Sequence, residues 1–386
     1  MFGCTAALTE PATKSNGQSS TSTSSPAAAR RFGQVDALRA VAALFVLWMH
    51  SSEALEHIAK SQAGATWPAR LAQQFDFGRI GVCLFFVISG FVVPPSYKGA
   101  RWPATKRFLW GRIWRLYPAF WLSILPGAWA SYWLWNKEFT LRDVALNLTM
   151  IPESFGAPMA MGLYWTLRIE WLFYALCVLL HLSGFLQSHR ARSALMLLCF
   201  AVGMSADRWP YDGLVRASSF AFTGMFLYGS CLRDESSTPS TARSGWPRLC
   251  ATDIYLFGVC ILLPSEAAYR HIGHGSMSWP YWLREFVPPA LGVLLFFVGL
   301  KYIVRVPRWL TRLGELTFSI YLLHPIFLHS VSYWAAVHPG SALWRMPLLA
   351  HIALIAALTM CAAHFVYEYV ELPAMRFGKK PAPAAA

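Results

Sequence analysis

Two ionisable residues stand out in the first apolar stretch of this chain: Arg39 and, eleven positions later, His50. In a helix, eleven steps of 100° leave both side chains on one face, about 16 Å apart along the axis. An arginine at the centre of a membrane helix costs ~2.5 to 3.5 kcal/mol, so such residues usually face a bundle interior or a wet cavity. Histidine is suited to general base catalysis near neutral pH, and arginine to binding an anion. The pair therefore predicts a site with His50 as base and Arg39 as anion contact.

Asp36 belongs to the same stripe, because it lies fourteen positions before His50 and about 40° from its face. A structural alternative stays open. In that alternative Asp36 and Arg39 form an ion pair near the membrane boundary, and His50 is a hydrogen-bonding strut between helices.

A second polar group begins at Tyr164 and Trp165. Thr166, Glu170 and Tyr174 follow at intervals of four residues, so they form one polar stripe on a helix that enters the membrane. The stripe makes Glu170 the leading candidate for an acidic site residue.

Glu170 and His50 fall at similar distances from the expected outer ends of their helices, so Glu170 could orient the base. An ion pair of Glu170 with Arg168 or Arg79 is an equally good structural interpretation.

Three further motifs carry polar groups. Gly81 and the pair Ser89 and Gly90 favour close helix approach more than a direct role for Ser89 in catalysis. The basic run ahead of Tyr117 fits either a phosphate site or simple retention of positive charge in the cytoplasm; it contains Lys106, Arg107, Arg112 and Arg115. His324 precedes Pro325, and is either a second functional imidazole or a strut between helices.

The elements that must position these residues are membrane helices. Hydrophobic residues make up 56% of the chain and charged residues only 13%, which a soluble domain of this length does not show. The net charge of +14 comes from short clusters between apolar runs, so nucleic-acid binding is not expected. Ten spans can be drawn, the fifth of them weak enough to leave nine possible: Leu38 to Leu55, Ile80 to Tyr97, Leu116 to Trp135, Leu163 to Leu186, Ala194 to Ala206, Leu214 to Leu232, Thr252 to Ala268, Phe286 to Val304, Leu316 to Val337 and Pro347 to Val370.

Charge asymmetry predicts the orientation of these spans. With the N-terminus inside, the cytoplasmic segments hold 21 of the 33 Lys and Arg residues and the outer segments hold 10. Residues 1–31 are expected to be a disordered cytoplasmic tail, residues 32–377 one transmembrane domain, and residues 378–386 a flexible cytoplasmic tail. The eight cysteines are scattered, so neither a disulfide framework nor a metal site is expected.

Together these motifs resemble the membrane acyltransferase-3 family over roughly Phe32 to Phe377. Six motifs occur in the family's order: Arg39 with His50; the Arg79 to Phe91 stretch ending in Ser-Gly-Phe; Arg107, Arg112 and Arg115 before Leu-Tyr-Pro; Tyr-Trp-Thr-Leu-x-x-Glu-x-x-Phe-Tyr; Tyr-Leu-Leu-His-Pro; and the closing Glu368 and Glu371 before Leu-Pro. Two departures are Cys83, where members often carry Asp, and Thr166, where they often carry Ser.

The resemblance implies about ten helices around a polar cavity in the inner membrane, and transfer of an acyl group, usually acetyl from acetyl-CoA, to a hydroxyl of a carbohydrate or lipid-linked acceptor of the cell envelope. It implies a catalytic role for Arg39, His50 and Glu170, and donor binding by Arg112 and Arg115, with Arg107 beside them. Asp36, Ser89, Tyr164, Trp165 and His324 are expected to support the site. Acyl-CoA is the expected co-substrate, without a metal.

The main alternative is a proton-coupled transporter or flippase, in which the same Arg, His and Glu side chains carry protons or bind a solute. The duplicated halves of many transporters are not visible in this sequence. Whether His50 acts as a base or carries the acyl group itself stays open.

Overall fold

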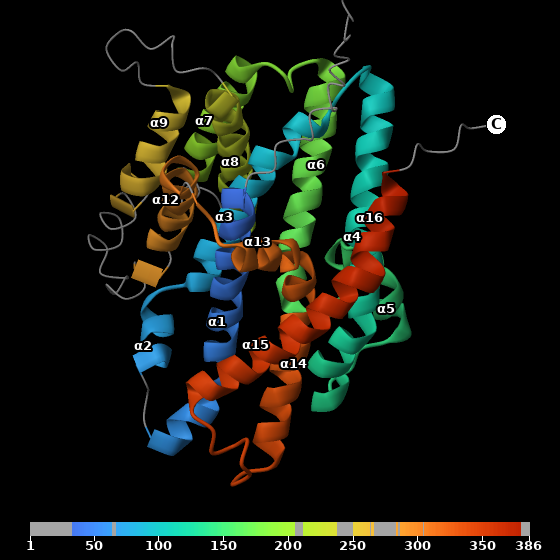
Figure 1. Ribbon diagram of the computed structural model, residues 1–386, viewed down its shortest axis with the longest axis vertical. Coiled ribbons are helices and arrows are strands. Elements are labelled where there is room, and N and C mark those ends of the chain that lie inside the picture. The colour runs from blue at the N-terminus through green and yellow to red at the C-terminus, as the bar shows by residue number, and fades with distance from the viewer. Residues whose placement is uncertain are drawn as a thin grey trace, which may run out of the picture. The chain divides into compact units, whose positions relative to one another are not determined.

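The computed structural model describes residues 33–63, 67–204, 211–237, 250–262, 264–265, 283–284, 286–303 and 305–379. All regular elements in these ranges are helices (Figure 1), so the predicted all-α class is confirmed. The expected tail at residues 1–31 and residues 380–386 of the second expected tail lie outside the described residues.

Helix α1 (Gly33–Ala63) carries both Arg39 and His50, and it packs against α3 (Phe77–Val92). The Asp76 carboxylate caps α3 by accepting a hydrogen bond from the Arg79 backbone N–H at 2.7 Å. The two helices approach so closely at Gly81 that a Cβ there would lie 2.5 Å from the Ala42 carbonyl oxygen. This contact confirms that Gly81 serves helix packing.

The other face of α3 packs against α8 (Tyr211–Ser237), which in turn packs against α7 (His189–Met204). Two glycines make the α3–α8 contact possible. A Cβ on Gly90 would lie 1.7 Å from the Phe226 carbonyl oxygen, and one on Gly229 would lie 2.0 Å from that of Val87. At these two glycines, the backbones of the two helices are therefore in direct contact.

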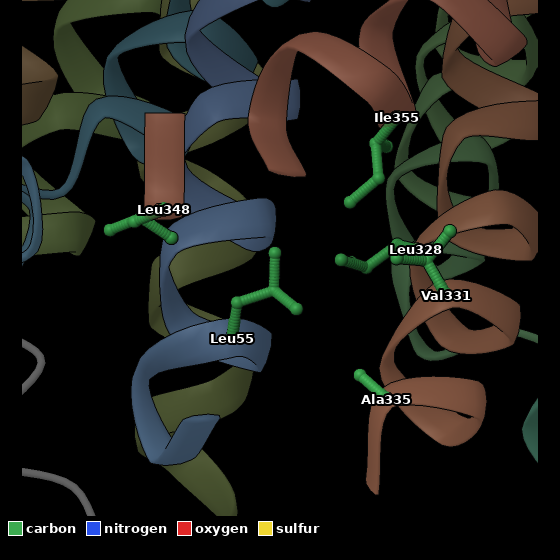
Figure 2. Close-up of a cluster of buried hydrophobic side chains, with 6 residues drawn as sticks. All are labelled: Leu55, Leu328, Val331, Ala335, Leu348 and Ile355. Carbon is green, nitrogen blue, oxygen red and sulfur yellow. The ribbon is translucent and has the colours of Figure 1, made fainter. Parts of the chain in front are cut away.

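Helix α1 also packs against α14 (Thr317–Val337), which in turn contacts α4 (Arg101–Ser131) and α15 (Leu348–Val366). Figure 2 shows the apolar side chains that hold the C-terminal half of α1 between α14 and α15: Leu55, Leu328, Val331, Ala335, Leu348 and Ile355. This cluster sets the end of α1 that carries His50 against α14.

Helix α15 continues through a π-helical turn, η8 (Tyr367–Glu371), into α16 (Leu372–Gly378), which packs against α4. Helix α6 (Trp165–Ser183) contacts both α4 and α8. The remaining helices lie around this core: α2 (Trp67–Gln74), α5 (Leu141–Asn147), α9 (Ala251–Phe257) with its π-helical extension η7 (Gly258–Leu262), α12 (Val287–Tyr302) and α13 (Arg308–Glu315), which lies crosswise to its neighbours in Figure 1.

Five helical segments in the described ranges are long and apolar enough to cross a membrane: Gly33–Leu55, Phe77–Ser96, Gly162–Ser183, Thr317–Val337 and Leu348–Gly378. Two shorter apolar helices cover Ala251–Leu262 and Val287–Tyr302. Each of the ten predicted spans falls at least partly on a helix, but the number ten itself stays a prediction.

Candidate active site

A cavity of about 100 Å³ lies where five helices meet. Its side chains come from α1 (Arg39), α3 (Val82, Phe85, Phe86 and Ser89), α4 (Arg115), α6 (Thr166, Leu167 and Glu170) and α14 (Thr317, Phe318 and Tyr321). Helices that are far apart in the sequence thus line the same cavity. Polar and apolar side chains share its wall, which suits a ligand with a charged or polar end and an apolar part.

Arg39, Arg115 and Glu170 are the charged side chains that line this cavity. The Arg39 Nη1 atom donates to the Asp36 Oδ1 atom at 3.3 Å, so the ion pair expected in the structural alternative is present. Arg115 and Glu170 also lie close enough to Arg39 to act on its charge. Arg112 also acts on Arg39, so the charged groups here are three guanidinium groups and two carboxylates. Their net charge is positive, which favours an anionic ligand.

The Glu170 carboxylate accepts a hydrogen bond from the Tyr174 hydroxyl, one helical turn further along α6. The Arg112 guanidinium lies over the Tyr174 ring at 5.3 Å and over the Phe108 ring at 5.2 Å. Arg112 therefore stands behind Tyr174, whereas Arg107 is exposed. Of the three arginines predicted to bind the donor, Arg115 is the one that lines the cavity.

Thr166 and Tyr321 join α6 to α14 across the cavity wall. Their hydroxyl oxygens are 2.6 Å apart, and the Tyr321 hydroxyl donates to the Leu163 carbonyl. A hydroxyl has one proton, so while Tyr321 donates to Leu163, Thr166 donates to Tyr321; the contact of Thr166 with the same carbonyl, at 3.4 Å, is the longer one. Thr166, one of the two departures noted in the sequence, therefore has a defined hydrogen-bonding role.

Tyr164 and Trp165 support the start of α6 rather than the cavity wall. The Tyr164 hydroxyl donates to the Ser123 Oγ atom of α4 at 2.7 Å, and the Trp165 ring lies against Phe222 of α8 with centroids 5.8 Å apart. The other departure, Cys83, is fully buried and faces Gly292 of α12. It is not part of the cavity lining.

His50 lies outside this cavity, about three helical turns from Arg39. Its imidazole is 29% exposed, and its ring centroid is 5.9 Å from that of His324, with the planes inclined by 26°. The His50 Nδ1 atom is 3.7 Å from the Glu53 Oε2 atom. The stripe on α1 thus has a cavity end, marked by Arg39, and a histidine end.

His324 is buried, and its Nδ1 atom is 3.1 Å from the Ile320 carbonyl oxygen. A carbonyl only accepts, so Nδ1 carries the proton and Nε2 has the lone pair. This Nε2 atom is buried and has no hydrogen-bond partner among the described residues. No group of three or more His, Cys, Asp or Glu side chains in the same ranges could hold a metal ion.

The expected approach of Glu170 to His50 is not what the structure shows. Glu170 lies at the Arg39 end of the stripe, and the carboxylate beside His50 is Glu53. Comparing depths from the predicted span ends misled here, because α1 continues to Ala63, beyond the predicted end of its span at Leu55. The two arginines considered as ion-pair partners of Glu170 pair with other carboxylates. Arg168 pairs with Glu153, and Arg79 pairs with Asp76.

Glu53 was missed from the sequence, although its position three residues after His50 places it on the same face of α1. Its other oxygen, Oε1, accepts a hydrogen bond of 2.5 Å from Arg284. No local pattern in the sequence connects Glu53 with a residue that follows it so much later.

Comparison with known proteins points to one family. A family model described as an acyltransferase domain, that of the acyltransferase-3 family, matches residues 32–367. The chain is 24% identical over 273 residues to BcsY of Komagataeibacter xylinus, named as a candidate membrane-bound transacylase; the match covers 64% of this chain and 65% of BcsY. It is 26% identical over 341 residues to YrhL of Bacillus subtilis strain 168, named as a candidate peptidoglycan O-acetyltransferase, over 77% of this chain and 50% of YrhL.

The match thus spans less than two thirds of the length of either relative. No solved structure matches the chain. The family model, however, covers most of the chain and includes the cavity, His50 and His324. The protein therefore belongs to the membrane acyltransferase-3 family.

Proposed function

We propose that this protein is an O-acyltransferase that moves an acyl group, acetyl in the simplest case, from acyl-CoA to a hydroxyl of a cell-envelope carbohydrate. The observation that carries the proposal is the single face of α1, with Arg39 in a positively charged cavity and His50 beside a second imidazole. Family membership supports acyl transfer and does not favour a transporter or flippase. The name of one relative describes acetylation of peptidoglycan.

The donor enters from the arginine end in this proposal. Pockets for drug-sized ligands usually measure ~300 to 1,000 Å³, so a cavity of about 100 Å³ suits part of the pantetheine arm better than the whole of CoA. Arg115 and Arg39 bind negatively charged or carbonyl oxygens inside, because guanidinium groups donate several hydrogen bonds and keep their charge. The exposed Arg107 attracts the nucleotide phosphates outside the cavity.

His50 acts as the general base. It accepts the proton of the acceptor hydroxyl while the hydroxyl oxygen attacks the thioester carbonyl. The new C–O bond forms, the C–S bond breaks, and the thiolate leaves and takes up a proton to give CoA-SH. The pantetheine arm is extended, so it can follow the face of α1 from Arg39 to His50. A version in which His50 carries the acyl group transiently needs the same residues.

The test uses full-length protein in detergent with labelled acetyl-CoA and envelope carbohydrate. His50→Ala is expected to lower kcat by about 10²- to 10⁴-fold, the usual contribution of a general base. The matched control is His338→Ala, since His338 is exposed at the end of α14 and should leave turnover unchanged. Absence of transfer by the wild type, or full transfer by His50→Ala, would overturn the proposal.

A further inference from the structure

One carboxylate on α1 contacts two partners at the histidine end of the stripe. The Glu53 Oε1 atom accepts a hydrogen bond from the Arg284 Nη2 atom at 2.5 Å. The other oxygen, Oε2, is 3.7 Å from the Nδ1 atom of His50. Glu53 therefore stands between His50 and an arginine that follows it by 231 positions in the chain.

Stability alone does not account for this arrangement. The Glu53 side chain is 43% exposed and the Arg284 side chain 36% exposed, and exposed ion pairs usually contribute little to stability. What the contact does restrict is the direction of the Glu53 carboxylate, because Arg284 holds one of its oxygens. The second oxygen is then kept beside one particular nitrogen of His50.

Whether Nδ1 of His50 carries the proton determines which imidazole nitrogen has the lone pair and can act as the base. A carboxylate only accepts hydrogen bonds, so a neutral His50 facing Glu53 keeps its proton on Nδ1 and its lone pair on Nε2. The distance of 3.7 Å is slightly longer than a hydrogen bond, as is common for catalytic contacts before substrate binds. The ionisable groups of α14 that act on His50 are imidazoles, His324 and His329, not carboxylates.

We propose that Glu53, held by Arg284, is a positioning residue that selects the Nδ1–H tautomer of His50 and leaves Nε2 to accept the hydroxyl proton. The catalytic part of this inference rests on the proposed function. The tautomer part can be observed without turnover. The pairing of an imidazole with an anchored carboxylate follows the general logic of a base and its orienting group.

The experiment measures the ¹⁵N chemical shifts of histidine in the full-length protein in lipid nanodiscs, with the His50 signals assigned by their loss in His50→Ala. The wild type should show His50 mainly as the Nδ1–H tautomer. Glu53→Gln should give a mixture of tautomers, because an amide both donates and accepts. Arg284→Gln leaves Glu53 in place but unanchored, so it should give a smaller change in the same direction.

Glu153→Gln is the matched control. Glu153 also pairs with an arginine, Arg168, and is similarly exposed at 45%, but it lies on a different element from His50. This variant should leave the His50 tautomer and kcat unchanged. In the acyl-transfer assay, Glu53→Gln should lower kcat at least about tenfold with little change in KM for acyl-CoA.

The inference is overturned if His50 keeps the Nδ1–H tautomer in Glu53→Gln, or if Glu53→Gln keeps the full kcat of an active wild type. If the tautomer responds but the wild type transfers no acyl group, the positioning contact is supported and the proposed function fails. Melting curves of each variant separate loss of folding from either result.

Discussion

At the scale of single residues, the cavity depends on a small number of polar contacts between helices. The Tyr321 hydroxyl accepts a hydrogen bond from Thr166 and donates one to the Leu163 carbonyl. Tyr321 is buried, so both partners would lose a hydrogen bond away from water if this hydroxyl were removed. Such losses typically cost about 1–3 kcal/mol.

Tyr321→Phe is therefore expected to lower the melting temperature of the protein in detergent. Tyr333→Phe is the matched control, since Tyr333 is on the same helix and its ring packs against Trp135. Equal melting temperatures for Tyr321→Phe and the wild type would show that the hydroxyl does not hold α6 to α14.

Arg115 and Arg107 should differ in their effect on donor binding, because only Arg115 lines the cavity. Hydrogen bonds to charged groups contribute about 1.5–3 kcal/mol, so Arg115→Gln should raise KM for acetyl-CoA at least about tenfold. Arg107→Gln should raise it less, and its effect should fade with added salt, which screens exposed charges. Initial-rate measurements at two salt concentrations test this, and equal, salt-independent effects would contradict it.

At the scale of elements, α3 and α8 approach each other so closely that two positions of their contact have no room for a Cβ atom. Gly90 faces the Phe226 carbonyl and Gly229 faces the Val87 carbonyl. Because Ser89 and Phe86 on the same helix line the cavity, any displacement of α3 from α8 also changes the shape of the cavity.

Gly90→Ala should destabilise the protein by about 1–3 kcal/mol, as overpacking does, and should reduce acyl transfer with it. Gly111→Ala is a matched control, since Gly111 lies inside α4 with open space around its missing Cβ. There alanine favours the helix by up to about 1 kcal/mol. A melting curve for Gly90→Ala that matches the wild type would mean that α3 and α8 are not so close.

At the scale of the whole molecule, the positive charges of the chain predict which side of the membrane each loop occupies. The orientation of the candidate spans is predicted from the positive-inside rule. In the proposed function, the arginine end of the α1 stripe is then the cytoplasmic end, where acyl-CoA binds, and the histidine end faces the acceptor.

A C-terminal fusion tests this orientation. With the C-terminus in the cytoplasm, a fusion to green fluorescent protein should fluoresce and a fusion to alkaline phosphatase should be inactive. Active phosphatase at the C-terminus would reverse the assignment and with it the proposed direction of acyl transfer.

Much of the helical structure could be predicted, because apolar runs identify membrane helices well. The predicted span Leu163 to Leu186 corresponds to α6, Trp165–Ser183. Helix α4 begins at Arg101, well before the predicted span Leu116 to Trp135. Its first turns are basic, and a hydropathy window ends where charges begin.

The site was predictable along one helix but not between helices. The stripe of Arg39 and His50 follows from helical periodicity alone. The level of Glu170 relative to His50 depends on how α6 is displaced along α1, and this displacement results from packing that no periodicity encodes. The contact of Arg284 with Glu53 likewise depends on tertiary structure.

The placement of Arg39 and His50 on one continuous helix has a mechanical consequence. A helix hardly changes length, so the separation of the two groups, about 16 Å, stays constant throughout a reaction cycle. The backbone positions of Arg39 and His50 therefore cannot move towards each other when a ligand binds, and the helix fixes the distance between them. In the proposed mechanism, the length of the donor's flexible arm then determines which thioesters can react. Inserting one residue between the two groups would rotate His50 by about 100° and remove it from the common face without altering any side chain.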